Sequence, residues 1–192
     1  MPRRDLTDER TSQILDALER CILKNGLQAS SLEKVAEEAG VKRPIIRHYI
    51  GNREDLLLAL TQRFVGRDRE RGLVMVRALG ETNRVEALLD TLFCSSNQTD
   101  AESILIYEEL ILAAARIETI RELISRSTAT FVNLIAKELR AEYPDSRGHT
   151  EVAWGVASIF YNQISLQALR LPPRLVGSSR AAAQRLVHSL RL

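Results

Sequence analysis

Apolar residues recur at intervals of three and four along nearly the whole chain, with polar residues between them. This is the period of helices that bury one side, and alternation with a period of two bounded by hairpin turns is absent. An all-α fold is therefore expected. The predicted helices run from about 7 to 25, over two short segments within 30–50, from 52 to near 72, and over 84–93, 101–115, 118–142, 150–171 and 178–190.

The most informative stretch is residues 26–56, where two short helices meet at a tight turn. Ser30 is expected to begin the first of them, because Glu33 three residues later completes an S-x-x-E capping box. Gly40 can adopt the left-handed conformation that ends a helix. Pro44 then suits the first turn of the second helix, where its missing N–H has no partner to lose. The pattern predicts a helix-turn-helix.

Charge along this stretch is unevenly distributed. Lys42, Arg43, Arg47 and Arg53 lie between Ala39 and the start of the next long helix with no acid among them, whereas acids crowd the preceding helix. A short helix with a basic edge fits the major groove of duplex DNA. The alternative is a solvated charged face on an ordinary helical turn. The net charge of the chain is only +2, so the prediction of DNA binding depends on this local patch.

At these residues the chain resembles the TetR family of transcriptional regulators. The resemblance implies an N-terminal three-helix DNA-binding module with a helix-turn-helix and a C-terminal helical ligand-binding and dimerisation domain. We expect the DNA-binding part at 1–52, a connecting helix and linker at 53–80, and the second domain at 81–192. The residues that carry the resemblance are Ile14-Leu15, Ala17-Leu18, Gly26-Leu27, Ser30-Ser31, Val35-Ala36, Ala39-Gly40-Val41, Ile46, Tyr49-Ile50 and Asn52-Arg53-Glu54-Asp55-Leu56-Leu57.

The function that the resemblance implies is a ligand-responsive one-component regulator. We expect a homodimeric repressor that binds double-stranded DNA at a near-palindromic operator and is released by a small-molecule effector. The runner-up is a helical protein–protein adaptor that uses the turn as a docking surface without binding DNA. A salt-dependent shift of duplex DNA separates the two, because only DNA binding releases counterions.

The expected DNA contacts fall on the second short helix and its neighbours. Two positions depart from the family pattern. Lys42 stands where a capping Ser or Thr is common, and Arg47 stands where a tyrosine is common. Bases or groove walls are assigned to Arg43, Ile45 and Arg47, phosphates to Ser31, Lys42, Tyr49 and Arg53, and Pro44 and His48 complete the predicted surface. The preceding residues Pro2-Arg3-Arg4 are expected to be an unstructured tail or an arm for the minor groove.

A stripe of aromatic and hydroxyl side chains on the helix predicted at 150–171 is the candidate ligand site. Trp154, Ser158 and Tyr161 recur at helical spacing, and Tyr107, Ile111 and Phe131 could face them. Aromatic surfaces with a few hydroxyls commonly hold apolar ligands, yet the same residues also make an ordinary core. The near absence of cations in the stripe favours a neutral or weakly polar ligand.

The last two predicted helices carry the signal for association. The first of them is apolar around more than half its circumference and needs cover on two sides. Pairing both with a symmetry mate would give a four-helix interface, whereas a monomer would bury the same faces internally. The residues assigned to the dimer interface are Val156, Phe160, Ala183, Leu186, Val187 and Leu190.

Other function classes lack support in the sequence. His48, His149 and His188 are scattered without zinc-site spacing, and neither a phosphate-binding loop nor a G-x-S-x-G motif occurs. We therefore expect no enzyme, no metal and no cofactor. No apolar run approaches the roughly 20 residues that span a bilayer, and the polar N-terminal residues do not resemble a secretory signal, so a cytoplasmic protein without a membrane partner is expected.

Overall fold

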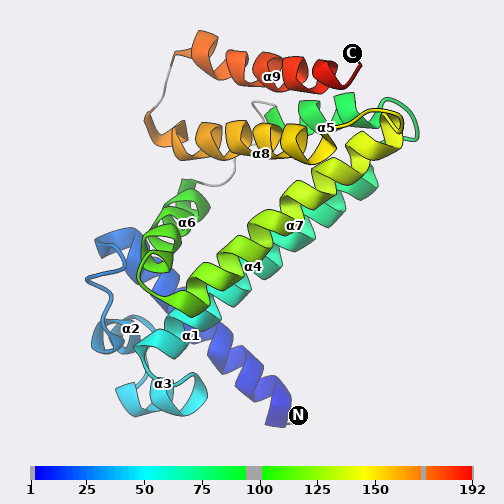
Figure 1. Cartoon of the computed structure of the whole chain (residues 1–192). Helices are drawn as coiled ribbons and strands as arrows, with labels where there is room; N and C mark the ends of the chain where they lie inside the picture. Colours follow the sequence, from blue (N-terminus) through cyan, green and yellow to red (C-terminus); the bar gives the residue numbers. More distant parts are fainter. Residues whose placement is uncertain (1–2, 94–100, 170–171, 192) are drawn as a thin grey trace. The chain divides into compact units, whose positions relative to one another are not determined.

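Helices make up the regular structure in the computed structural model, which describes residues 3–93, 101–169 and 172–191 (Figure 1). No strand occurs among these residues, so the expected all-α class is confirmed. The helices are α1 (Arg3–Asn25), α2 (Leu32–Glu38), α3 (Arg43–Tyr49), α4 (Arg53–Ala78), α5 (Arg84–Phe93), α6 (Ala101–Ala114), α7 (Glu118–Glu142), α8 (His149–Ser165) and α9 (Pro173–His188), with 3-10 turns at Gln167–Leu169 and Ser189–Arg191.

The N-terminal helix starts earlier than its sequence suggested. Helix α1 already includes Arg3, so Thr7 lies inside the helix, and the expectation of an unstructured tail at Arg3 and Arg4 is wrong. Pro2 lies outside the described residues. No glycine or proline interrupts the run between Pro2 and Gly26, so the helix can extend back to Arg3.

The boundary between the last two helices also differs from expectation. Helix α8 ends at Ser165, earlier than the predicted 171, and α9 begins at Pro173, earlier than the predicted 178. Pro172-Pro173 was expected only as a break. A proline in the first turn loses no hydrogen bond and already has a helical φ, so the same pair that stops one helix can start the next.

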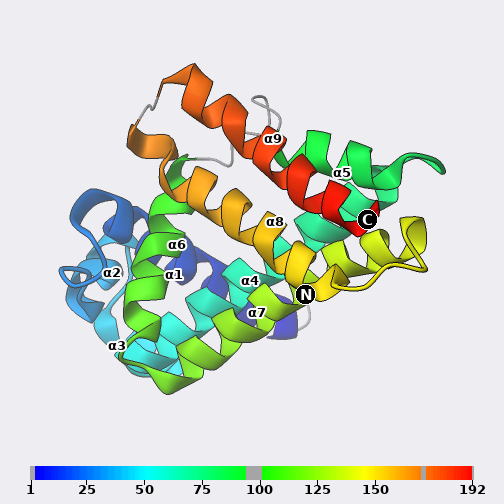
Figure 2. The same cartoon turned by 45° about the horizontal axis from the view of Figure 1, so that its top comes forward.

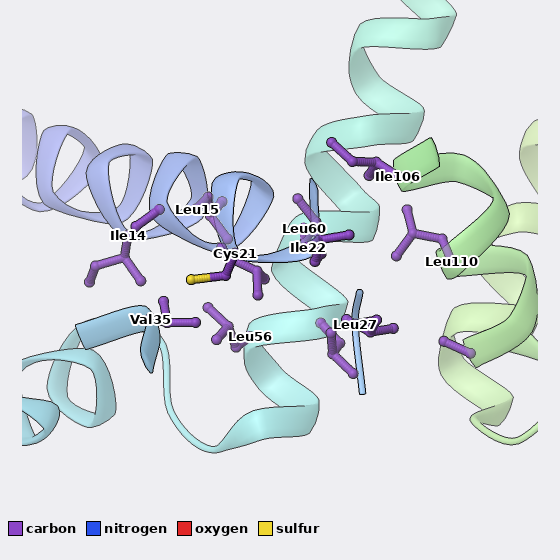
Figure 3. Close-up of a cluster of buried hydrophobic side chains, with 14 of the residues drawn as sticks. Ile14, Leu15, Cys21, Ile22, Leu27, Val35, Leu56, Leu60, Ile106 and Leu110 are labelled. Carbon is purple, nitrogen blue, oxygen red and sulfur yellow. The ribbon is translucent and has the colours of Figure 1, made fainter. Parts of the chain in front are cut away.

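The first compact unit joins Met1–Gly66 to Leu105–Ile124. Its core brings the apolar stripes of α1, α2 and the first half of α4 against the second half of α6 (Figure 3). Ile14, Val35, Ile46 and Leu60 are fully buried there. The two short helices therefore rest on a core that extends well beyond them in the sequence. Its labelled members in Figure 3 are Ile14, Leu15, Cys21, Ile22, Leu27, Val35, Leu56, Leu60, Ile106 and Leu110.

The second compact unit joins Arg67–Ile104 to Ser125–Leu192. Within it α8 and α9 lie side by side, and α5 packs along α9 (Figures 1 and 2). Charged pairs connect these helices. Arg84 of α5 meets the buried Glu138 of α7 at 2.7 Å, and Arg180 of α9 meets Asp90 of α5 at 2.7 Å.

These packing units do not follow the linear order of the chain. The second half of α6 and the beginning of α7 pack with the N-terminal helices, although they follow α5 in sequence. The division into a DNA-binding segment at 1–52, a connecting segment at 53–80 and a ligand-binding and dimerisation segment at 81–192 describes function, and it stays a prediction. Sequence patterns predict only contiguous domains, because they do not show which distant helices share a core.

Candidate nucleic-acid interface

The turn between α2 and α3 has the geometry expected for a helix-turn-helix. Gly40 has φ +66°, the left-handed conformation predicted for it. Its N–H donates to the Glu37 carbonyl at 3.1 Å, and the Val41 N–H donates to the Ala36 carbonyl at 2.9 Å. This pair of bonds is a Schellman motif, which closes the end of α2. Val41 packs against the core of the first unit, as expected for the residue at the corner.

The cap of α2 lies one residue later than expected. Ser31, not Ser30, is the N-cap, and its hydroxyl accepts from the Lys34 N–H at 3.3 Å. Ser30 is buried and donates to the Gly26 carbonyl at 2.8 Å. The S-x-x-E pattern therefore selected the wrong serine of two neighbours, because burial of Ser30 against the preceding loop is a tertiary effect.

Helix α3 has one buried and one exposed side. Ile46 is fully buried and attaches the helix to the core, while the Tyr49 ring is half-buried and meets the His48 ring edge-on at 5.0 Å. Lys42 is the N-cap and makes no side-chain capping bond, as its departure from the family pattern predicts. The predicted DNA-contacting residues that are exposed on this side are Lys42, Arg43, Pro44, Ile45, Arg47 and His48.

An acid of α2 also reaches this exposed side. The Glu33 carboxylate forms an ion pair with Arg43, with 2.7 Å between Oε1 and Nη1. The sequence had suggested that this edge contains no acid. Glu38 is directed elsewhere, because Arg20 and Lys24 of α1 each pair with it at 2.7 Å. The contact between Glu33 and Arg43 was not expected from the sequence, since the two residues lie on different helices.

Arg53, at the start of α4, has a different environment from the other cations. Its guanidinium donates to the Leu27 carbonyl at 2.8 Å and to the Ser30 carbonyl at 3.1 Å. These carbonyls belong to the loop that leads into α2. Asn52 caps α4 as expected, its Oδ1 accepting from the Glu54 N–H at 2.7 Å. Arg53 therefore connects the start of α4 to the start of α2, and its predicted phosphate contact would have to compete with these two bonds.

Substitution of Arg53 distinguishes its structural role, which is to hold the loop before α2, from the predicted phosphate contact. Arg53→Lys keeps the charge but cannot bond both carbonyls with a planar fork, so we expect it to lower the melting temperature nearly as much as Arg53→Ala does, by about 2–4 °C for a loss of roughly 1 kcal/mol. Thermal unfolding measures this effect. Arg53→Lys with unchanged stability but Arg53→Ala with weakened DNA binding would instead favour a phosphate contact.

The predicted ligand stripe does not face inwards along its whole length. Trp154 is 55% exposed and Ser158 is also exposed in the single chain, and their assignment to a ligand site stays a prediction. Tyr161 and Phe131, in contrast, are half-buried with ring centroids 5.6 Å apart. Phe160 lies 5.5 Å from Phe131. We call Phe93, Phe131, Phe160 and Tyr161 the aromatic cluster of the second unit, which Phe93 joins through Phe160 at 6.3 Å.

The other two predicted ligand residues belong to the first unit. The Tyr107 ring stacks on Phe64 with 5.6 Å between centroids, and Ile111 is exposed on α6. Helical spacing placed both on one face of α6, but Tyr107 is half-buried against the core of the first unit. Their assignment to a ligand site stays a prediction.

Most residues assigned to the dimer interface are buried within one chain. Val156, Ala183, Val187 and Leu190 belong to the core of the second unit and Phe160 to the aromatic cluster, and their assignment to an interface stays a prediction. Leu186 is 36% exposed and covers Gly155, where an added Cβ would lie 2.8 Å from Leu186 Cδ1. We call the exposed set Trp154, Ser158, Ala182 and Leu186 the outer face of α8 and α9.

Metal binding and membrane insertion find no structural basis in the part of the chain described. Across residues 3–93, 101–169 and 172–191, no three His, Cys, Asp or Glu side chains are grouped so that they could hold a metal ion. Within the same ranges, no helix has both the length and the apolar character required to cross a bilayer.

Comparison with known proteins relates this geometry to a family. Residues 14–60 match the family model for bacterial regulatory proteins of the tetR family. The HTH-type transcriptional regulator BetI of Agrobacterium fabrum is 29% identical over 187 residues, covering 96% of this chain and 89% of that protein. BetI of Rhizobium meliloti is 25% identical over 190 residues, covering 98% and 93%. These relatives are transcriptional regulators and not enzymes.

A solved structure supports the fold assignment. A putative transcriptional regulator from Saccharomonospora viridis, in complex with choline, has a TM-score of 0.75 at 16% identity and covers 94% of this chain and 96% of its own. At this identity the similarity concerns the fold alone.

Proposed function

We propose that the chain is a homodimeric repressor of a near-palindromic operator, because residues 14–60 match the family model for bacterial regulatory proteins of the tetR family and its relatives over most of the chain are HTH-type transcriptional regulators. The observation that carries the proposal is the two-sided character of α3. Ile46 is buried in the core while Arg43, Ile45 and Arg47 are exposed. An exposed, basic helix held from behind can enter a major groove without unfolding its support.

Phosphate contacts would fix this helix on the duplex. Lys42 and Tyr49 flank it, and Ser31 lies at the start of α2, where backbone N–H groups point outwards and favour an anion. In this proposal Arg53 acts mainly through the loop that it holds, because its guanidinium already bonds two carbonyls. Phosphate contacts position the protein, whereas the contacts of α3 with base edges select the sequence.

Selection of bound fragments from random duplex DNA tests the proposal. We expect the enriched fragments to share two inverted half-sites separated by about one helical turn, as a two-fold symmetric dimer requires. Their affinity should fall steeply as salt rises, because each phosphate contact releases condensed counterions. Failure to enrich any sequence, together with binding that does not respond to salt, would favour the adaptor function instead.

The dimer would form through the outer face of α8 and α9. This surface exposes Trp154 and Leu186 although both are large apolar residues. The buried stripes of the same helices already satisfy the core of the second unit. A second copy that covers the exposed face would therefore remove apolar area from water without disturbing either core.

The effector site is proposed at the aromatic cluster of the second unit. Phe131, Phe160 and Tyr161 are half-buried, and rings at these separations offer an apolar surface with one hydroxyl. Such a surface suits a neutral or weakly polar ligand. Aromatic faces also attract quaternary ammonium groups, and the structural neighbour from Saccharomonospora viridis is described in complex with choline.

Phe131→Ala should weaken effector binding about tenfold, because it removes one ring from the cluster and the contacts that this ring makes with Phe160 and Tyr161. Isothermal titration with a neutral hydrophobic probe and separately with choline measures the effect and identifies which ligand class binds. The bound ligand should also weaken operator binding, since coupling between two sites is reciprocal.

Tyr143→Ala provides the control for this experiment, because Tyr143 lies in the second unit, has the Arg191 guanidinium 5.6 Å from its ring centroid and is not one of the rings of the aromatic cluster. A ligand that binds both variants with the affinity of the wild type would place the effector site elsewhere.

A further inference from the structure

The ion pair between Glu33 and Arg43 joins the first turn of α2 to the leading end of α3. Arg43 Nη1 lies 2.7 Å from Glu33 Oε1, and the two side chains are 51% and 59% exposed. An exposed pair of this kind contributes little to folding stability. It does, however, place a negative charge on the surface proposed to approach DNA, which is itself negatively charged. An acid in the first turn also suits the dipole of α2, so any effect of Glu33 on DNA recognition has to be separated from its effect on the helix.

The Glu33 carboxylate is itself held in place. Its pKa is lowered because it accepts a hydrogen bond from its own backbone N–H and another from the Ser31 hydroxyl, with a smaller contribution from the charge of Arg43. A lowered pKa keeps the carboxylate ionised at neutral pH. Glu33 is therefore an ionised, hydrogen-bonded carboxylate at the start of α2.

A guanidinium can satisfy Glu33 and a base at the same time. Its N–H donors form a planar fork, and the bond through Nη1 leaves the edge formed by Nε and Nη2 available. Guanine is recognised by two parallel donors on its O6 and N7 atoms, which is what this second edge provides. A phosphate beyond the reach of this edge could be contacted only if Arg43 left Glu33.

We propose that Glu33 is a positioning residue for sequence recognition, which holds Arg43 in the orientation that reads a guanine edge and opposes its use as a phosphate anchor. The inference rests on the proposed binding of DNA through α3. It assigns to Glu33 a role in discrimination between sequences, at the expense of affinity for DNA in general. Specificity often depends on such a repulsive element as well as on attractive contacts.

Glu33→Gln tests the inference, with Glu37→Gln as the matched control. Glu37 is exposed on the same helix, and no ion pair to it is found within the described ranges, so both variants remove one negative charge from α2. Affinity for the selected operator and for an unrelated duplex should be measured at several salt concentrations, and base preference by repeated selection.

We expect Glu33→Gln to bind the unrelated duplex about three- to tenfold more tightly and to have a steeper salt dependence there by about one unit per protomer, because each released Arg43 can gain a phosphate. The ratio of specific to nonspecific affinity should fall, and the guanine preference in each half-site should broaden. Glu37→Gln should raise both affinities by the same small factor and leave base preference unchanged.

Two outcomes overturn the inference in different ways. If Glu33→Gln and Glu37→Gln have the same affinity ratio, salt slope and base preference, Glu33 has no positioning role, although the protein still binds DNA. A wild type that binds no duplex removes the proposed function and this inference with it. In the Arg43→Ala background, adding Glu33→Gln should not change base preference any further. A further change in base preference there would also overturn the positioning role.

Discussion

Leu186→Glu should convert the proposed dimer into a folded monomer. Leu186 lies on the outer face of α8 and α9 and is already 36% exposed in one chain, so a carboxylate there can remain hydrated in the monomer. In a dimer the two-fold axis would bring two such charges into a desolvated interface. The expected loss is at least about 3 kcal/mol of association free energy, or roughly a hundredfold in the dissociation constant.

Sedimentation at micromolar concentration measures the change, and Trp154 gives an independent signal. It is the sole tryptophan of the chain and belongs to the same outer face, so its emission should shift to the red when the monomer forms. Leu112→Glu is the matched control, because Leu112 is 66% exposed on α6 in the first unit. A folded Leu186→Glu variant that still sediments as a dimer would exclude this face from the interface.

Local signals in the sequence were sufficient where the backbone alone determines the conformation. Gly40 ends α2 because a left-handed residue is needed there, and Asn52 caps α4 through its own side chain. The same reasoning failed at Ser30, which has Glu33 three residues later but is buried and bonded to the Gly26 carbonyl, whereas the actual cap is Ser31. A cap predicted from spacing therefore needs the tertiary environment to choose between neighbouring candidates.

The sides of α8 illustrate a second limit of sequence analysis. Helical periodicity separates the stripe with Val156 from the stripe with Trp154, but it does not say which stripe faces the chain's own core. The aliphatic stripe is buried in the core of the second unit, whereas Trp154 is exposed. Aliphatic residues next to the small Ala153 and Ala157 allow close approach of neighbouring helices, which an indole would prevent.

Contacts of a side chain with residues on other helices or loops could not be predicted from the sequence. Arg53 bonds carbonyls that lie 23 and 26 residues earlier, and Arg43 pairs with an acid on another helix. Both arginines were recognised as part of a basic patch, because the order of charged residues along the chain identifies such a patch. Their partners depend on how α2, α3 and α4 are packed, which no local pattern contains.

The consequence for DNA recognition is that neighbouring cations should behave differently. Lys42 and Arg43 are adjacent and both exposed, so replacing either by alanine removes one positive charge from nearly the same place. Lys42 is the N-cap of α3 and has a point charge suited to a phosphate, whereas Arg43 presents a planar fork held by Glu33.

Arg43→Ala should therefore cost roughly 1–3 kcal/mol per half-site on the selected operator and relax the preference at one base position in each half. Lys42→Ala should weaken binding to all duplexes alike and reduce the salt slope by about one unit per half-site, without changing base preference. Titrations on the selected and an unrelated duplex at several salt concentrations, with repeated selection for each variant, distinguish the two. If the variants are indistinguishable in both base preference and salt slope, α3 does not enter the groove with its leading end as proposed, even if the protein binds DNA.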